Sequence, residues 1–400
     1  MLIVTVRDGK QLSLKTNFVT QIIKEISCSN LLFVYRKEQE QFTERKQRNE
    51  IELATSPVGI ALYFAFLYFL KSPKDLKDGI VRRLHGQKNL PLLIRYGGSL
   101  TVLSQALYQY FARSARTDNL LHFLEKQKSP KIFLIDEFFS LNVVNLKALK
   151  KLGSIIYVSS DFAYDFYKDN PAASKLMYKF EQAAIALPDL VVVCSERDKL
   201  KYLDMGAKEV TYYPNIYPME DFDVCKKSQT PSISIVLRGY WGPRITQSLE
   251  ELFQALGYIG ESISVNIIGA KPRNVPKNVE LHSYDFIPSK QEYLEILSKS
   301  WIGINLGVHL GGTNQRKYDY ALSGSIVFSD NFGVRGDLLP HEYAFVDKHD
   351  LAAKLQQLLE LGRDEIAAMG LENRQHALSL VRKQQAKLQN SLDGILKRSS

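Results

Sequence analysis

Short apolar runs alternate with longer amphipathic stretches along most of this chain. Continuous apolar or β-branched runs in the first half predict strands at 2–6, 31–35, 131–135, 154–158, 190–194 and 209–213. Apolar residues at helical spacing predict helices at 140–151 and 172–186. Because the strand runs are continuous rather than alternating, we expect strands buried on both faces, as in a parallel sheet with helices on each side.

The second half repeats this pattern. Its strands are predicted at 233–238, 264–268, 279–282, 302–306, 326–329 and 344–346, and its helices at 247–258, 290–299, 315–322 and 351–361. The tail 363–400 has helical spacing, so one or two helices should pack outside the second sheet. The polar stretch 215–231, with Pro218 and Pro231, is the linker candidate. We therefore predict an α/β protein of two doubly wound domains, 1–223 and 231–400.

The region 38–116 departs from the alternation. Residues 57–70 (PVGIALYFAFLYFL) are apolar all round and are followed by the basic residues Lys71, Lys74, Lys77, Arg82, Arg83, Lys88 and Arg95. A helix of this length reaches about 21 Å, short of the roughly 30 Å hydrocarbon layer of a bilayer. Two interpretations stay open: a monotopic helix on an anionic membrane surface, or a buried helix followed by a solvated basic stretch.

The charge and the cysteine and histidine content limit the classes of partner and cofactor that we expect. The formal charge of +9 favours an anionic partner, but no nucleic-acid signature accompanies it, so we expect no nucleic acid. The three cysteines and seven histidines have no metal-ligand spacing, and we expect no cofactor and no protein-bound metal. The first residues lack the features of a secretory signal, so the expected location is the cytoplasm, with peripheral attachment to its membrane face if residues 57–70 insert.

Ligands of doubly wound sheets bind at the carboxyl ends of the strands. The strand 233–238 ends in an arginine, and two glycines and a second arginine follow it. Each arginine can offer a fork of N–H donors to phosphate. The candidates are Arg238, Gly239 and Arg244. The loop 284–288 is considered together with the loop at Gly269, because each follows a predicted strand. Their apolar side chains, such as Phe286, and their free backbone groups are candidates for holding a base. Each loop alone also fits an ordinary βα turn.

The loop after 302–306 has the stronger signal. Gly311, Gly312 and Thr313 lie where the helix 315–322 should begin, and the amides of a helix N-terminus form an anion site. Arg316 lies one turn inside that helix and can add a full charge to the same phosphate. Asp319 is on the same face and suits ribose hydroxyls. An exposed Arg–Asp pair on a capped helix is the alternative.

At these loops the chain resembles retaining glycosyltransferases of the GT-B fold, specifically glycosyltransferase family 4. Residues 189–222 (DLVVVCSERDKLKYLDMGAKEVTYYPNIYPMEDF) are similar to the end of that family's first domain. Residues 311–330 (GGTNQRKYDYALSGSIVFSD) are similar to its phosphate- and ribose-binding block. The likeness extends from about 131 to 361 and is weak over 38–116. It implies two Rossmann-like domains facing an interdomain cleft.

The resemblance implies that a hexosyl group passes from a nucleoside diphosphate sugar to an acceptor hydroxyl with retention. Arg316 falls on the family's phosphate residue, Asp319 on its ribose-binding glutamate, Gly239 on its glycine loop and Arg244 nearest to its second basic residue. Arg244, Arg316 and the amides of 311–313 would stabilise the departing diphosphate. Gly311 stands where the family often has an earlier glutamate.

The acceptor should come from the first domain. Its strand ends contain Asp136, Glu137 and Asp161, of which Asp161 is the preferred catalytic candidate because it follows the strand 154–158. The apolar-basic stretch points to a sugar or lipid-linked acceptor, as in polysaccharide or glycoconjugate biosynthesis. Two other functions stay open on this fold: a non-catalytic binding or scaffold subunit and a sugar-nucleotide epimerase.

Overall fold

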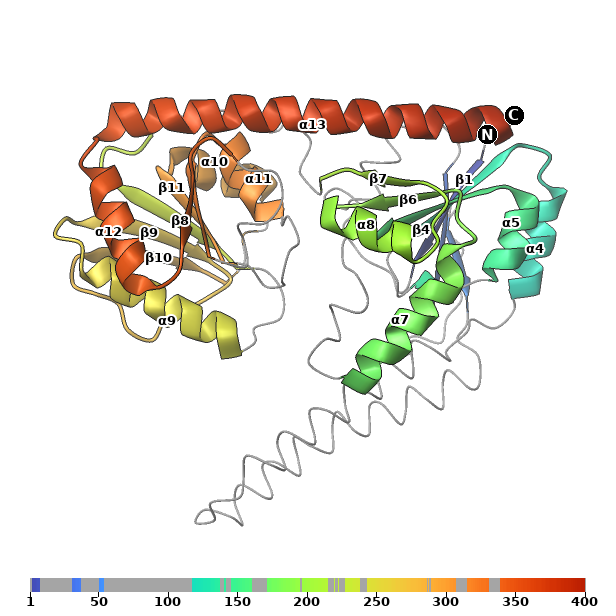
Figure 1. Ribbon diagram of the computed structural model, residues 1–400, viewed down its shortest axis with the longest axis horizontal. Helices are drawn as coiled ribbons and strands as arrows, with labels where there is room; N and C mark the ends of the chain where they lie inside the picture. The colour runs from blue at the N-terminus through green and yellow to red at the C-terminus, as the bar shows by residue number, and fades with distance from the viewer. Residues whose placement is uncertain are drawn as a thin grey trace, which may run out of the picture. The chain divides into compact units, whose positions relative to one another are not determined.

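The computed structural model describes two compact α/β units (Figure 1). The described residues are 2–7, 31–36, 50–53, 117–136, 140–141, 145–159, 171–194, 196–214, 219, 222, 227–237, 243–285, 287, 289–306, 315–330 and 339–399. The first unit comprises Met1–Val193, Asp198–Tyr212 and Leu388–Ser400, and the second comprises Cys194–Arg197 and Tyr213–Lys387. Against the expected limits of 1–223 and 231–400, residues 213–223 group with the second unit and residues 388–400 with the first.

Seven parallel strands form the first sheet, in the order β3-β2-β1-β4-β5-β6-β7. They are β1 (Leu2–Arg7), β2 (Leu31–Arg36), β3 (Glu50–Leu53), β4 (Lys131–Asp136), β5 (Ser154–Ser159), β6 (Leu190–Val193) and β7 (Val210–Tyr212). The helices described with them are α4 (Thr117–Lys126), α5 (Leu146–Leu152), α7 (Pro171–Ile185) and α8 (Glu196–Asp204). Strands β4, β5 and β6 are buried almost throughout, as expected of continuous apolar runs.

Six parallel strands form the second sheet, in the order β10-β9-β8-β11-β12-β13. They are β8 (Ser232–Val236), β9 (Ile263–Ile268), β10 (Val279–Tyr284), β11 (Ile302–Asn305), β12 (Ile326–Asp330) and β13 (Glu342–Phe345). The helices are α9 (Pro243–Gly257), α10 (Lys290–Lys299), α11 (Gln315–Leu322) and α12 (Lys348–Leu359). The order reverses between β8 and β11, which makes this pair the switch point of a doubly wound sheet.

Successive residues of the second sheet face two different cores. Ile235 of β8 belongs to the cluster that contains Leu252 of α9. The next residue, Val236, belongs to the cluster that contains Leu297 of α10 and Val381 of the last helix. Since side chains alternate across a strand, both faces of the sheet are covered by helices. The prediction of two doubly wound parallel sheets is confirmed.

The tail forms a single helix, α13 (Arg363–Ser399). It runs from the second unit into residues that group with the first (Figure 1). Its buried positions recur every eleven residues, which is about three helical turns. They are Ile366, Gly370, Asn373, then Ala377, Val381, Gln384, then Leu388, Leu392 and Ile395.

The described part of the predicted linker is bound to the second unit. The Lys227 ammonium is buried and donates to the carbonyls of Ser298, at 3.1 Å, and Ser300, at 2.6 Å. The indole N–H of Trp301 donates to the Ser228 carbonyl at 3.0 Å. Residues 227–231 are therefore fixed to the second sheet and do not act as a free connection.

Several elements differ from the predicted ones. Strand β3 was not predicted, and no bounds were predicted for helices α4 and α8, although helices were expected between the strands. Helix α5 begins at Leu146, because the Asn145 side chain accepts the amides of Lys147 and Ala148 and caps the helix there. Among the residues described, no helix is both long and apolar enough to cross a membrane. The stretch 57–70 and the basic residues after it lie outside the described residues.

Candidate functional site

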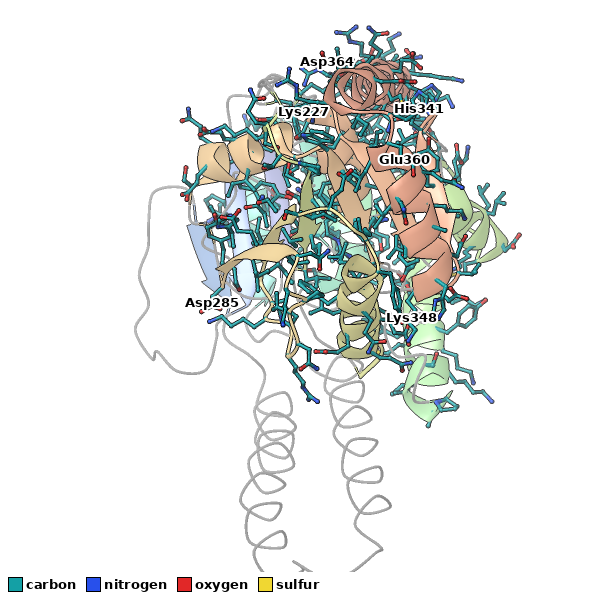
Figure 2. The ribbon with its side chains drawn as sticks, turned by 90° about the vertical axis from the view of Figure 1, so that its left-hand side faces the viewer. Lys227, Asp285, His341, Lys348, Glu360 and Asp364 are labelled. Atoms are coloured by element: carbon teal, nitrogen blue, oxygen red, sulfur yellow. The ribbon has the colours of Figure 1, made fainter. Side chains whose placement is uncertain are left out.

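The donor site was expected at the carboxyl edge of the second sheet. Asp285, after β10, and Lys348, at the start of α12, mark this edge, whereas Lys227 and His341 lie toward the opposite one (Figure 2). The loops after β8 and β11, which were expected to bind phosphate, leave the sheet here. Helix α11 begins nine residues after Leu306 and packs against β11 and β12.

Tyr320 of α11 joins the ends of β8 and β11. Its hydroxyl accepts the backbone N–H of Val236 at 2.8 Å and donates to the carbonyl of Ile304 at 3.2 Å. The register of the two strands is defined up to the pair Ile304 and Ile235. The hydroxyl therefore links the strands at the point where the pairing of their backbones ends.

Gly303 makes room for that tyrosine. A Cβ atom at this position would come within 2.1–2.6 Å of the Tyr320 ring. No ordinary contact is that short, so the ring packs directly on the backbone of β11. Tyr320 itself is fully buried.

Arg316 lies on the same helix and holds the same two strands. Its guanidinium donates through Nη1 to the Val236 carbonyl at 2.9 Å and through Nη2 to the Leu306 carbonyl at 3.2 Å. The residue is 8% exposed. The described contacts of Arg316 are thus with the main chain at the strand ends, and its contact with phosphate stays a prediction.

Asp319 does not share a described partner with Arg316. Its Oδ2 accepts the hydroxyl of Tyr293 from α10 at 2.8 Å, and the residue is 1% exposed. A carboxylate is costly to bury without hydrogen bonds, and the tyrosine supplies one. Ribose binding by Asp319 stays a prediction. Removing the Tyr293 hydroxyl would test how strongly the carboxylate depends on it.

A buried ion pair fixes the other side of α11. Lys317 Nζ lies 2.6 Å from Glu342 Oε2, and both side chains are 1% exposed. The second carboxylate oxygen accepts the Ser329 hydroxyl at 2.9 Å. This pair connects α11 to the start of β13 and the end of β12.

The carboxyl end of α11 is held by groups from other segments. The Arg374 guanidinium donates to the Leu322 carbonyl, and the Asn373 amide to the Ser325 carbonyl at 3.2 Å. The turn between them contains Gly324 with a positive φ of 72°. Since a helix C-terminus has a partial negative charge, a cation there stabilises α11.

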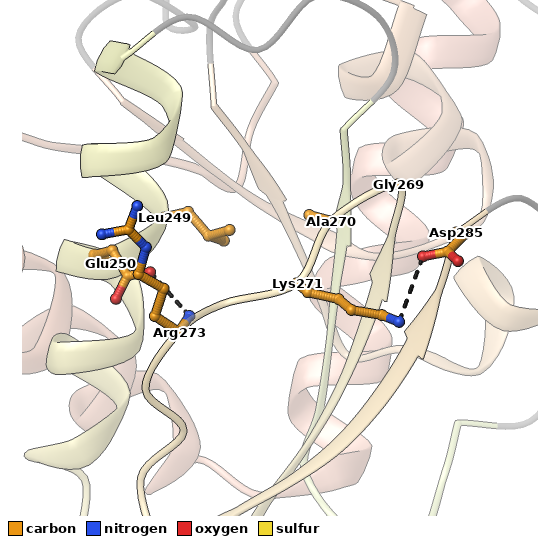
Figure 3. Close-up of a pocket in the computed structure, with 7 residues that line it drawn as sticks. All are labelled: Leu249, Glu250, Gly269, Ala270, Lys271, Arg273 and Asp285. Carbon is orange, nitrogen blue, oxygen red and sulfur yellow. Dashed lines mark hydrogen bonds and ion pairs between the residues drawn. The ribbon is translucent and has the colours of Figure 1, made fainter. Parts of the chain in front are cut away.

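A cavity of about 500 Å³ lies by α9 and the ends of β9 and β10, which are on the opposite side of β8 from β11 (Figure 3). Helix α9 contributes two of its lining residues, the loop after β9 four, and the end of β10 one: Leu249, Glu250, Gly269, Ala270, Lys271, Arg273 and Asp285. The two loops that were expected to hold a base therefore line one cavity, with Gly269 on the first and Asp285 on the second.

The loop of this cavity is fixed through its backbone. Gly269 adopts a positive φ of 84° and donates its N–H to the Tyr284 carbonyl at 2.7 Å. The N–H of Arg273 donates to Glu250 Oε1 at 2.9 Å. Lys271 and Asp285 approach each other to 3.7 Å across the opening, but both are largely exposed, so the pair is weak and its charges are accessible (Figure 3).

Of the acceptor-side candidates, Asp136 is described and lies buried at the end of β4. The remaining predicted residues have no described side chains. Arg244 lies in the first turn of α9. Arg238, Gly239, Gly311, Gly312, Thr313, Phe286 and Asp161 lie outside the described residues, as does Glu137, and their roles stay predictions. Among the residues described, no three histidine, cysteine or acidic side chains gather as metal ligands.

A buried hydrogen-bond network at the end of β5 in the first unit was not predicted from the sequence. Glu181 accepts the hydroxyls of Tyr157, at 2.7 Å, and Tyr202, and a further hydrogen bond of 2.9 Å joins the hydroxyls of Tyr202 and Ser159. Burial, and then the Glu181 carboxylate, raise the pKa of Tyr202 well above its usual range. The contact between Tyr320 and Gly303 at the switch point was not predicted either. A glycine within the run IGIN and two tyrosines in a charged helix are the only local signals of that contact.

Comparison with known proteins finds similar structures but no similar sequences. No family model matches the chain, and no curated protein matches its sequence. Among solved structures, it is similar to sucrose-phosphate synthase from Thermosynechococcus elongatus, with a TM-score of 0.60 and 11% identity over 100% of both chains. It is similar to the UDP-forming α,α-trehalose-phosphate synthase from Burkholderia vietnamiensis, with a TM-score of 0.60 and 12% identity over 100% of both.

A third similar structure is Anabaena HepE in complex with UDP and glucose, with a TM-score of 0.57 and 9% identity over 98% of this chain and 100% of that one. Identities this low establish architecture and not chemistry. The likeness covers both units, and each has a doubly wound parallel sheet. The chain therefore has the GT-B fold, with two Rossmann-like domains.

Proposed function

We propose that this protein is a glycosyltransferase that moves a sugar from a nucleoside diphosphate sugar to an acceptor hydroxyl with retention of configuration. One observation supports this most: a cavity of about 500 Å³ and the origins of both candidate phosphate loops meet at the carboxyl edge of the second sheet. The solved structures of this fold that resemble the chain include a UDP-forming synthase and a protein that binds UDP and glucose.

The cavity is the proposed site of the nucleoside. Its volume of about 500 Å³ lies within the range of small-molecule sites. Leu249 and Ala270 are buried and give it an apolar floor, while the exposed charges of Lys271 and Asp285 stand at its opening. A flat base can lie on the floor, and Lys271 is within reach of an anionic or polar group beside it.

The diphosphate is proposed to lie next to the start of α11. The positive end of the helix dipole is there. At the opposite, negative end, the Arg374 guanidinium donates to the Leu322 carbonyl and so stabilises the helix. Gly311, Gly312 and Thr313 precede this end in the sequence. Arg316 brings a guanidinium to the same strand ends, so the local potential favours an anion.

The difficult step is the departure of the diphosphate as negative charge builds on its oxygen atoms. Fixed N–H groups and cations aimed at that charge stabilise the transition state more than the ground state. Arg244, Arg316 and the amides of 311–313 are proposed for this role. Asp161 is proposed to orient or deprotonate the acceptor hydroxyl.

A binding measurement with matched charge reversals tests the site. Titration calorimetry with UDP, then with a panel of nucleoside diphosphate sugars, should show binding to the wild-type protein. Lys271→Glu should weaken binding about five- to tenfold at low salt, because it removes a cation from the cavity opening. Lys277→Glu makes the same charge change on an exposed residue that does not line the cavity and should have little effect.

Turnover distinguishes the alternatives. With a competent acceptor, the anomeric coupling in the NMR spectrum of the product should show the configuration of the donor. Inversion would contradict retention, and the absence of any binding would contradict the nucleotide site. Binding without transfer across a broad acceptor screen would instead indicate a non-catalytic subunit.

A further inference from the structure

Two strands of the second sheet give rise to both loops that are proposed to bind the diphosphate. The loop after β8 leaves at Leu237, and the loop after β11 leaves at Leu306. Because β8 and β11 are neighbours at the switch point, both loops start from adjacent strand ends. Whatever fixes these ends therefore affects both phosphate contacts together.

Helix α11 fixes them with two side chains. The Tyr320 hydroxyl accepts a hydrogen bond from the Val236 N–H at 2.8 Å and donates one to the Ile304 carbonyl at 3.2 Å. One turn earlier, Arg316 binds the carbonyls of Val236 and Leu306. Both polar groups of the Val236 backbone are thus bound by α11.

The position of the tyrosine ring is determined by β11. Gly303 leaves the space that the ring fills, since a Cβ there would lie 2.1 Å from the ring. The hydroxyl is held at one place between the strands by packing from one side and by two hydrogen bonds. Removing only its oxygen leaves the ring in that space and removes one of the two side-chain links between the strand ends, while Arg316 keeps the other.

We propose that Tyr320 is a positioning residue for the donor diphosphate, acting through the ends of β8 and β11 and not by touching the ligand. This rests on the proposed function, because it takes the loops after these strands as the diphosphate site. Small displacements of groups that bind a transition state reduce rates strongly, so the hydroxyl has an effect beyond its own contribution to stability.

The matched pair Tyr320→Phe and Tyr157→Phe tests this. Each substitution removes one hydroxyl from a fully buried tyrosine, but Tyr157 donates to Glu181 in the first unit. The probe is UDP in titration calorimetry, followed by steady-state kinetics with the donor that gives turnover. Melting temperatures of both variants record the loss of stability.

Tyr320→Phe should weaken UDP binding about tenfold or more and raise the KM for the donor, with the KM for the acceptor unchanged. Tyr157→Phe should leave UDP binding within about twofold of wild type, although its melting temperature should fall about as much as that of Tyr320→Phe. If both variants bind UDP as wild type does, Tyr320 is structural only and the proposal is wrong. Equal weakening in both variants also overturns it, because the effect would then follow stability.

A second variant probes the same contact without removing the hydroxyl. Gly303→Ala places a methyl group where the ring lies, so the ring and its hydroxyl must shift. It should weaken UDP binding as Tyr320→Phe does, and the double variant should be no worse than either single one. Additive losses would show that the two residues act independently and would contradict the proposal.

These results separate the two proposals. If wild-type protein does not bind UDP or any nucleoside diphosphate sugar, the proposed function fails, and this inference falls with it. If wild type binds and Tyr320→Phe binds equally well, the positioning role alone is refuted and the nucleotide site stands.

Discussion

The buried pair of Lys317 and Glu342 allows a quantitative test of how α11 is held. Lys317→Met keeps most of the side-chain volume and leaves the Glu342 carboxylate buried without its cation. Removing one partner of a buried ion pair costs about 3–5 kcal/mol. For a unit of this size, that loss should lower the melting temperature by roughly 6–20 °C.

The assay follows the second unit alone. The chain has two tryptophans, Trp241 and Trp301, and both belong to that unit. Urea unfolding monitored by tryptophan fluorescence therefore gives the free energy of unfolding of the second unit without a signal from the first.

The control is Lys299→Met, which breaks an exposed i,i+4 pair with Glu295. An exposed pair contributes about 1 kcal/mol or less, so this variant should be close to wild type. The double variant Lys317→Met/Glu342→Gln removes the uncompensated charge and should recover part of the loss. The reasoning is refuted if Lys317→Met costs no more than Lys299→Met.

Three further predictions concern packing and ionisation. Gly370→Ala should destabilise the second unit by more than about 2 kcal/mol, since its Cβ would lie 2.0 Å from the Gly324 carbonyl oxygen. On the same helix, a Cβ at Gly394 meets nothing within 4 Å, so Gly394→Ala should stabilise the protein by up to about 1 kcal/mol. Thermal unfolding measures both changes, and changes of the same sign would contradict the packing at Gly370. Tyr293→Phe removes a donor from buried Asp319 and should lower the free energy of unfolding by about 1–3 kcal/mol in urea, against little change for the exposed Tyr258→Phe. Burial raises the pKa of Tyr202 above the ordinary 10.0, so the unfolded chain loses this proton first and stability should fall as the pH rises past about 10. Tyr202→Phe should reduce that alkaline slope in pH-dependent melting curves, and an unchanged slope would exclude Tyr202 as its source.

The sequence predicted the sheets well because their strands are nearly continuous apolar runs. Strand β5 (SIIYVS) is buried at five of its six positions, and such a run has few alternatives to a doubly covered strand. Strand β3 (EIEL) was missed for the opposite reason. It alternates acidic and apolar residues over four positions and pairs with only one neighbour, at the edge of its sheet.

The helix that contains Arg316 and Asp319 was predicted, whereas the binding roles of these residues stay predictions. The sequence indicated the helix at 315–322, and its bounds agree with α11. Helical spacing shows which residues share a face, but it does not show which neighbour that face meets. Arg316 meets the ends of two strands, and Asp319 meets Tyr293, 26 residues away in sequence. No local pattern gives partners that only the fold brings together.

The eleven-residue repeat of α13 makes this helix sensitive to changes in phase. Inserting a single residue before Leu388 would rotate everything after it by about 100° and turn Leu388, Leu392 and Ile395 away from their buried side. Inserting eleven residues would restore the alignment and lengthen the helix by about 16 Å. Length changes close to whole turns, such as seven, eleven or eighteen residues, should therefore disturb this packing less than a change of one or two residues.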